Sequence, residues 1–252
     1  MASVGVACID QTPTSPSANA LIVNAVLDLA ARNQYVTVQS TTGATSQQKA
    51  VIGAVVSITI PGGRELLAEE ILDSAQVTAP YMIPRLRTIY RISLDRHGVE
   101  LVPGGTYHLR VATPDGRVAT GSTTIPQAAT YTITPQALTI ERLRDTFRLS
   151  VPKIPGASAY EIFVASPFGG SALFSDTAVV LPGVVSGVTG GIVFHPSMSH
   201  VLVVSAVDAN YYDFYRRTTD FFDGAGLINR LDGAIGVFGS IVPIARCTVT
   251  VR

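Results

Sequence analysis

The clearest pattern in the chain is the alternation of apolar and polar residues between positions 99 and 127. Tyr107, Leu109 and Val111 are separated by polar residues, which places apolar side chains on one face of a strand. A Pro-Asp-Gly turn at residues 114–116 follows, and residues 118–125 are mostly small or β-branched. The pattern predicts a β-hairpin of the kind found in β-sandwiches.

The first half of the chain contains further strand patterns. Residues 20–30 and 34–39 predict an opening hairpin, and residues 51–60 alternate apolar side chains before a Pro-Gly-Gly turn. Residues 64–73 have a helix-forming composition, and a short helix or an irregular crossing segment fits them equally well. Together these elements predict a first module over residues 20–127, an immunoglobulin-like or transthyretin-like sandwich.

The second half also has the pattern of short strands. Residues 147–164 contain a strand, a Pro-Gly-Ala turn and a second strand in which Tyr160 and alternating aliphatic residues face one way. This arrangement resembles the front half of a fibronectin type III domain. Residues 201–207 are an apolar run of strand length, which we expect to be fully buried. We therefore predict a second, fibronectin-like sandwich over residues 128–252.

Composition supports this fold class and narrows the classes of function. The 252 residues suffice for two sandwiches, so we expect an all-β protein of two consecutive β-sandwich modules. Eighteen Lys and Arg balance eighteen Asp and Glu, and only 14% of the residues are charged. A neutral chain without clustered basic residues lacks the electrostatic footprint of a nucleic-acid-binding protein or of a polybasic membrane-surface protein.

The N-terminal residues resemble the end of a bacterial lipoprotein signal. Small residues lead into Cys8, and Thr, Ser and Pro residues follow it. In such signals the cysteine becomes the lipidated first residue, so we expect residues 1–19 to comprise the end of the signal and a flexible tether. The alternative is a disordered tail with an incidental cysteine. If Cys8 is not lipidated, its pairing with Cys247 stays open.

The sequence contains no nucleophile elbow, zinc-protease helix, phosphate loop or dinucleotide fingerprint. His195 and His200 flank a short turn and, with Asp208, form one candidate metal site, against which polar loop histidines are the simpler interpretation. Weak candidates for calcium ligands are Asp208, Asn210 and Asp213. The competing interpretation is capping and turn hydrogen bonding by these side chains. We expect no cofactor.

An aromatic cluster follows the apolar run, because residues 211–215 hold three Tyr and one Phe. Exposed rings here would stack on sugars or dock a protein partner, with contacts from Tyr211, Tyr212, Tyr215 and Arg216. The alternative is that most of the rings belong to the core, with the arginine at its rim. Either a loop or a short helix would carry these residues.

Three segments carry a resemblance to a known family: residues 51–58, 105–126 and 233–240, together with the leader at Cys8. They resemble an uncharacterised family of bacterial envelope lipoproteins, a domain of unknown function found chiefly in Bacteroidota. The resemblance implies an outer-membrane-anchored protein with tandem immunoglobulin-like and fibronectin-like modules. It transfers no catalytic residue.

These observations favour a non-catalytic lipoprotein that serves as a binding or assembly module at the cell envelope, accessory to an outer-membrane transport system. Its partner would be an outer-membrane protein or a glycan, and its only membrane contact would be the lipid anchor. A glycan-active hydrolase, with a site assembled from distant residues, would instead show a pocket where carboxylates or histidines converge. A structural spacer would lack an exposed aromatic patch around residues 211–215.

Overall fold

The apolar and polar alternation produces β-strands along most of the part of the chain that the structure describes. The computed structural model describes residues 20–42, 47–71, 89–129, 137–141, 146–151, 153–167, 169–175, 178–182, 194–195, 197–219 and 229–252. The elements up to residue 124 are β1 (Leu21–Asp28), β2 (Asn33–Thr42), β3 (Gln47–Ala50), β4 (Val55–Thr59), β5 (Glu65–Leu67), β6 (Glu69–Ile71), β7 (Ile89–Ser93), α1 (Leu94–His97), β8 (Thr106–Ala112) and β9 (Val118–Thr124). The later elements are β10 (Ala137–Ile140), β11 (Thr146–Ser150), β12 (Ala159–Ser166), β13 (Gly169–Ser175), β14 (Ala178–Pro182), β15 (Ser199–Val207), α2 (Ala209–Thr219) and β16 (Ile235–Val251).

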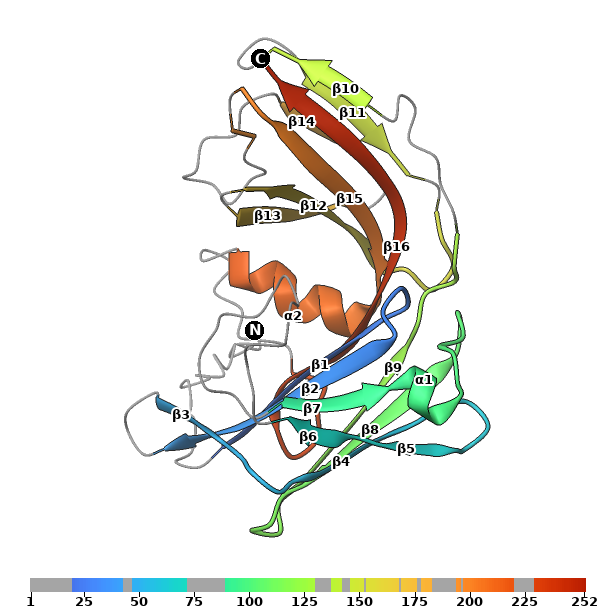
Figure 1. Ribbon diagram of the computed structural model, residues 1–252, viewed down its shortest axis with the longest axis vertical. Coiled ribbons are helices and arrows are strands. Elements are labelled where there is room, and N and C mark those ends of the chain that lie inside the picture. The colour runs from blue at the N-terminus through green and yellow to red at the C-terminus, as the bar shows by residue number, and fades with distance from the viewer. Residues whose placement is uncertain are drawn as a thin grey trace, which may run out of the picture.

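The described strands form three sheets (Figure 1). The largest has ten strands in the order β13-β12-β15-β16-β1-β2-β7-β6, with β10 added to β16 and β3 added to β2. A four-stranded sheet has the order β5-β4-β8-β9, and β11 pairs with β14. In Figure 1 the large sheet curves through the whole height of the molecule, and the four-stranded sheet lies across its lower end.

The seventeen-residue strand β16 connects the two ends of the large sheet. Its residues 235–241 run parallel to β1, and its residues 241–250 run antiparallel to β15. The second pairing contains a bulge beside Pro243, a residue that has no backbone N–H to donate to the ladder. Strand β16 therefore pairs with β1 from residues 20–127 and with β15 from residues 128–252. The division into modules at these two ranges stays a prediction.

The four-stranded sheet packs its apolar face against the large sheet. In β8, Tyr107, Leu109 and Val111 are almost fully buried and alternate with exposed residues. They belong to the same hydrophobic cluster as the buried residues of β1, β2 and β7, so the two sheets share one core. The all-β sandwich fold is confirmed, and so are the predicted hairpins β1–β2 and β8–β9.

The helix considered for residues 64–73 is wrong for the part that the structure describes. Glu65–Leu67 pairs with β4 and Glu69–Ile71 pairs with β7, so both segments are strands. Backbone hydrogen bonds to neighbouring strands and the burial of Leu66 outweigh the small helix propensities of Leu and Glu. At Ala68 the chain passes from the four-stranded sheet to the large sheet, which fits the crossing alternative more closely.

Residues 208–217 follow the helical alternative, since Ala209–Thr219 forms α2 directly after β15. Neither α2 nor any other helix in the described part of the chain combines the length and the apolar character needed to cross a membrane.

Candidate functional site

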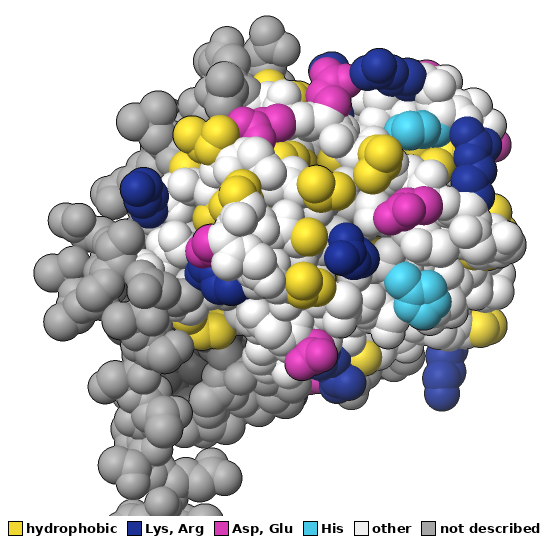
Figure 2. Space-filling view, turned by 90° about the horizontal axis from the view of Figure 1, so that it is seen from below, with side chains coloured by type: hydrophobic (Ala, Val, Ile, Leu, Met, Phe, Trp, Pro, Cys, Tyr) yellow, Lys and Arg dark blue, Asp and Glu magenta, His cyan; other side chains and the backbone are white. Residues whose placement is uncertain are grey.

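The outer face of the four-stranded sheet is the candidate functional site. Because side chains alternate across a strand, one set of residues points into the core and the other points to solvent. We define the outer face by the solvent-facing residues of β4, β5, β8 and β9, and its exposed members are Val55, Glu65, Leu67, Thr106, His108, Arg110, Val118, Thr120, Ser122 and Thr124. Figure 2 views the molecule from the side on which these strands lie and shows charged, histidine and apolar side chains together.

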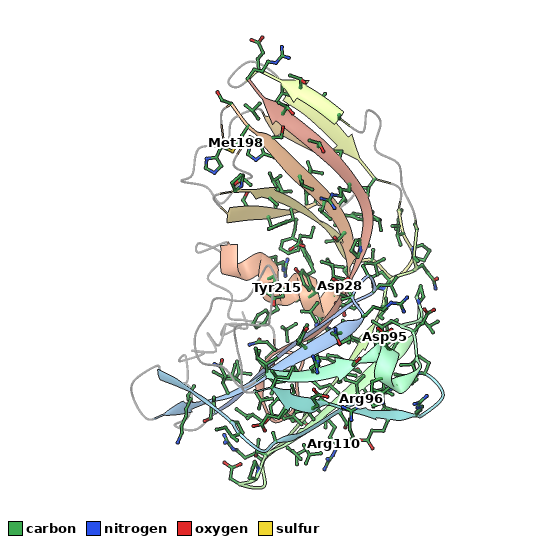
Figure 3. All side chains as sticks on the ribbon, viewed as in Figure 1. Asp28, Asp95, Arg96, Arg110, Met198 and Tyr215 are labelled. Atoms are coloured by element: carbon green, nitrogen blue, oxygen red, sulfur yellow. The ribbon has the colours of Figure 1, made fainter. Side chains whose placement is uncertain are left out.

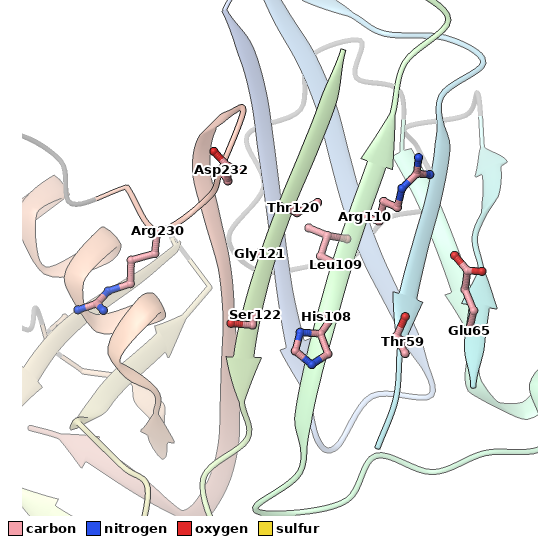
Figure 4. Close-up of a pocket in the computed structure, with 10 residues that line it drawn as sticks. All are labelled: Thr59, Glu65, His108, Leu109, Arg110, Thr120, Gly121, Ser122, Arg230 and Asp232. Atoms are coloured by element: carbon pink, nitrogen blue, oxygen red, sulfur yellow. The ribbon is translucent and has the colours of Figure 1, made fainter. Parts of the chain in front are cut away.

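A trough of about 480 Å³ crosses the outer face (Figure 4). Strands β4, β5, β8 and β9 provide most of its lining, and the segment that leads into β16 provides Arg230 and Asp232. The charged and imidazole side chains of the lining are Glu65, His108, Arg110, Arg230 and Asp232. The volume lies within the range of ligand pockets, which is about 300–1,000 Å³.

Strand register arranges the outer-face residues in rows across the sheet. One row is Glu65, Thr59, His108 and Ser122, and the next is Leu67, Ser57, Arg110 and Thr120, in which Ser57 is buried. Asp232 extends the second row, because its backbone forms a bridge with Thr120. Glu65 and Asp232 lie toward opposite edges of the sheet, and His108 and Arg110 lie on the inner strand β8. Arg230, at the same edge as Asp232, is paired with Asp213. Neighbouring strands lie about 4.8 Å apart.

Arg110 is the unpaired cation of the trough within the described chain. Neither the side chain of Arg110 nor that of His108 has a hydrogen-bond or ion-pair partner among the described residues. Arg230, in contrast, forms an ion pair with Asp213 on α2. The guanidinium of Arg110 therefore has its hydrogen-bond donors available for an external acceptor.

An exposed apolar row lies directly beside the trough. Val55, Ala112 and Val118 are cross-strand neighbours on β4, β8 and β9. Val55 is 54% exposed and Val118 is 44% exposed, while Leu67 on β5 is 56% exposed and Ile52 just before β4 is 64% exposed. A contiguous set of exposed aliphatic side chains bordered by charges is typical of interaction surfaces.

A buried polar network holds this sheet to α2 and β16. The carboxylate of Asp208 accepts hydrogen bonds from the backbone N–H of Tyr211 at 3.0 Å and of Ser240 at 2.9 Å. It also accepts one from the hydroxyl of Thr123 at 2.7 Å. Burial raises the pKa of Asp208, and the hydrogen bond from Thr123 opposes that rise. Because Ser122 and Thr124 flank Thr123 and face outward, the network fixes the position of the trough wall.

The calcium candidates are used in other contacts. Asp208 caps α2, and the side-chain amide of Asn210 donates to the carbonyl oxygens of Ser122 at 2.7 Å and Phe238 at 2.8 Å. Asp213 pairs with Arg230 and Arg216. Among the described residues no group of three or more His, Cys, Asp and Glu side chains is placed to hold a metal ion. These contacts correspond to the capping and hydrogen-bonding interpretation.

The aromatic cluster lies between α2 and the large sheet. Tyr211 is 1% exposed and its hydroxyl donates to Glu161 at 2.8 Å, so this ring belongs to the core. Tyr212 and Tyr215 are half-buried, and the guanidinium of Arg216 lies 4.8 Å from the centre of the Tyr212 ring. In Figure 3, Tyr215 of α2 lies in the middle of the molecule, whereas Arg110 lies at its lower edge. Partner contact by Tyr212, Tyr215 and Arg216 stays a prediction.

The histidine metal site is wrong, because its three members do not converge. His200 lies near the start of β15 and Asp208 follows its end, a separation of about 26 Å in an extended strand. The ring of His200 is fully buried, and its Nε2 lies 3.0 Å from the carbonyl oxygen of His195. Both histidines thus belong to local packing at the far end of the strand.

Of the two cysteines, Cys247 lies in the described part of the chain. Cys8 lies outside the described residues, so its lipidation is not tested. Cys247 is buried in β16, and burial raises the pKa of its thiol. Pairing of the two stays open.

Sequence reasoning did not identify the outer face as a site. It placed the polar residues between Tyr107, Leu109 and Val111 on the opposite face of a strand but gave no reason to connect His108, one of them, with Glu65 or Asp232. The signal for outward orientation was present in the alternation of β8. The missing information was the strand register, which determines which outward side chains become neighbours.

Among solved structures, one with some similarity is a Ca2+-stabilised adhesin that helps an Antarctic bacterium bind ice. The two chains are 14% identical, and the match covers 93% of this chain and 50% of the adhesin chain at a TM-score of 0.23. This chain thus spans about half the length of that adhesin chain, and the low TM-score gives the similarity no weight. No curated protein matches the sequence.

A family model gives a clearer result. The model described as a domain of unknown function, DUF4249, matches residues 9–241, which include the outer face and the Asp208 network. The match confirms the expectation of an uncharacterised family. The chain belongs to the family of the domain of unknown function DUF4249.

Proposed function

We propose that this protein is a non-catalytic lipoprotein of the cell envelope that binds or assembles with a partner through the outer face. The main support for this binding role is the position of Arg110: its side chain is unpaired, lies on the inner strand β8 and is next to the exposed row of Val55 and Val118. Apolar surface next to an available guanidinium is the composition that protein interfaces favour. Tyr211 is buried in the core, so we assign the main partner contact to the outer face, and contact by the half-buried Tyr212 and Tyr215 stays a prediction.

The arrangement of acids supports binding rather than glycan hydrolysis. A glycosidase needs two carboxyl groups about 5–9.5 Å apart across the scissile bond. The carboxylates that line the trough are Glu65 and Asp232, and they lie at opposite edges of the sheet. Four strand spacings of about 4.8 Å separate them by about 19 Å.

The proposed location is the envelope of a Bacteroidota-type bacterium, where Cys8 carries the lipid anchor and the partner belongs to an outer-membrane transport system. Small residues before Cys8 and a Thr/Ser/Pro tether after it support lipidation. A tether of this composition leaves the folded part free to reach a neighbouring outer-membrane protein. Mass spectrometry of the native N-terminus tests the anchor: an acylated Cys8 supports it, and an unmodified Met1 contradicts it.

Photo-crosslinking in intact cells tests the binding role. A photoreactive phenylalanine analogue replaces Ser122 in the trough, and the matched control carries it at Thr248, an exposed position on β16 outside the four-stranded sheet. We expect an adduct with an outer-membrane protein from position 122 and none from position 248. The absence of an adduct from position 122, or release of sugar from a glycan panel by the purified protein, contradicts the proposal.

A further inference from the structure

The outer face presents charges in a fixed order that a partner must match. Glu65 lies on the edge strand β5, His108 and Arg110 lie on β8, and Asp232 lies beyond β9. Each acidic position is two strand spacings, about 10 Å, from strand β8, which carries the Arg110 cation. A complementary surface therefore has an anionic group at its centre and cationic groups on both sides.

The centre of this pattern fits a carboxylate. Arg110 projects between Ser57 and Thr120 of the neighbouring strands and is exposed. It has no ion-pair partner within the described chain. A guanidinium binds a carboxylate through two parallel hydrogen bonds, and such pairs recur as energetic centres of protein interfaces.

The surroundings of Arg110 favour a protein segment over a sugar. Ala112 follows Arg110 on the same face of β8 and lies between Val55 and Val118, so aliphatic side chains adjoin the guanidinium. Sugar sites commonly place a Tyr, Phe or Trp ring against the sugar, and the residues that line the trough include none of these. Aliphatic side chains of a polypeptide match the apolar row better than sugar hydroxyls do.

We infer that the outer face docks a polypeptide segment in which an Asp or Glu is flanked by aliphatic residues, with Lys or Arg farther out. The acidic side chain pairs with Arg110, the aliphatic residues cover Val55 and Val118, and the outer cations face Glu65 and Asp232. This assignment rests on the proposed function and names the chemistry of the partner for the same face.

Selection from a random peptide library displayed on phage tests the assignment with a defined probe. The purified wild-type protein is expected to enrich peptides with an acidic residue next to aliphatic ones. The Arg110→Glu variant is expected to enrich Lys or Arg at that place instead, and Arg110→Ala is expected to weaken the selected wild-type peptide by about tenfold. Lys153→Glu makes the same charge change at an exposed position outside the four-stranded sheet and should leave the selection unchanged.

Each result decides the question. Enrichment that is independent of position 110, or no enrichment above the phage background, overturns the inference, provided circular dichroism shows that the variants are folded. Tight binding of a glycan from an array of neutral and acidic polysaccharides, lost in Arg110→Ala, also overturns it. That last result leaves the proposed binding role intact, and the crosslinking experiment on intact cells tests the role without assuming the partner's chemistry.

Discussion

Replacing Asp208 by Ala tests whether the buried network holds the four-stranded sheet to α2 and β16. The substitution removes the acceptor for the backbone N–H groups of Tyr211 and Ser240 and for the hydroxyl of Thr123. Leaving a buried donor without an acceptor costs about 1–3 kcal/mol. Because two backbone donors lose their acceptor, we expect the free energy of unfolding to fall by about 2–6 kcal/mol. This loss already includes the effect of removing the helix cap.

Asp208→Asn is the matched control. Its side-chain oxygen still accepts from both backbone N–H groups, and its amide donates to Thr123 where the carboxylate accepted. Since Asn caps helices about as well as Asp, we expect a loss of about 1 kcal/mol or less.

Urea unfolding followed by circular dichroism measures both variants, and hydrogen exchange locates the change. A lower midpoint with an unchanged slope reports lost stability, and we expect faster exchange of the β9 amides in Asp208→Ala. An Asp208→Ala protein within 1 kcal/mol of the wild type would refute the reasoning. Equal losses in the two variants would refute it as well, because they would show that the retained acceptor has no effect.

Three further predictions follow from charges and close contacts. Burial raises the pKa of Asp208 above 3.8, so the folded protein binds this proton more tightly than the unfolded chain does. The wild type should therefore gain stability relative to Asp208→Asn as the pH falls from 7 toward 4, which urea unfolding at each pH measures. The side chain of Arg117 lowers the pKa of Asp115 to about 2, so the stability that this carboxylate contributes is present above about pH 4 and is lost as the pH falls toward 2. In an NMR titration, Arg117→Ala should return the titration midpoint of Asp115 toward 3.8. Gly236 has a φ of 135°, and a Cβ there would lie 1.9 Å from the carbonyl oxygen of Val23. Gly236→Ala should therefore separate β1 from β16 and lower the free energy of unfolding by about 3 kcal/mol or more. Thermal unfolding measures this loss, and an unchanged melting temperature would contradict it.

The residues 65–71 show where local composition misleads. Leu66, Leu67, Glu69 and Glu70 are good helix formers, yet the structure places them in two short strands. Glu69 forms ion pairs with Arg91 and Arg96, which lie twenty or more residues farther along the chain. Helix propensities differ by only a few tenths of a kcal/mol per residue. Strand pairing and these ion pairs, which only the assembled sheets provide, outweigh them.

The aromatic cluster shows a second limit. The sequence identified a dense set of rings after residue 207, and the structure places the helix α2 there. Whether a given ring is buried depends on the partner surface: Tyr211 meets Glu161 from β12 and is buried, while Tyr212 and Tyr215 keep part of their surface exposed. That partner surface comes from strands about fifty residues away, so local pattern cannot supply it.

The sequence by itself determined the all-β class, the two confirmed hairpins and the direction in which each side chain of β8 points. These features depend on a two-residue period and on turn residues, both of which are local. Only the tertiary structure decided the candidate site. Arg110, Leu67, Thr120 and Asp232 become neighbours through hydrogen-bonded register between segments far apart in the chain, and a shift of one residue would turn every side chain to the opposite face.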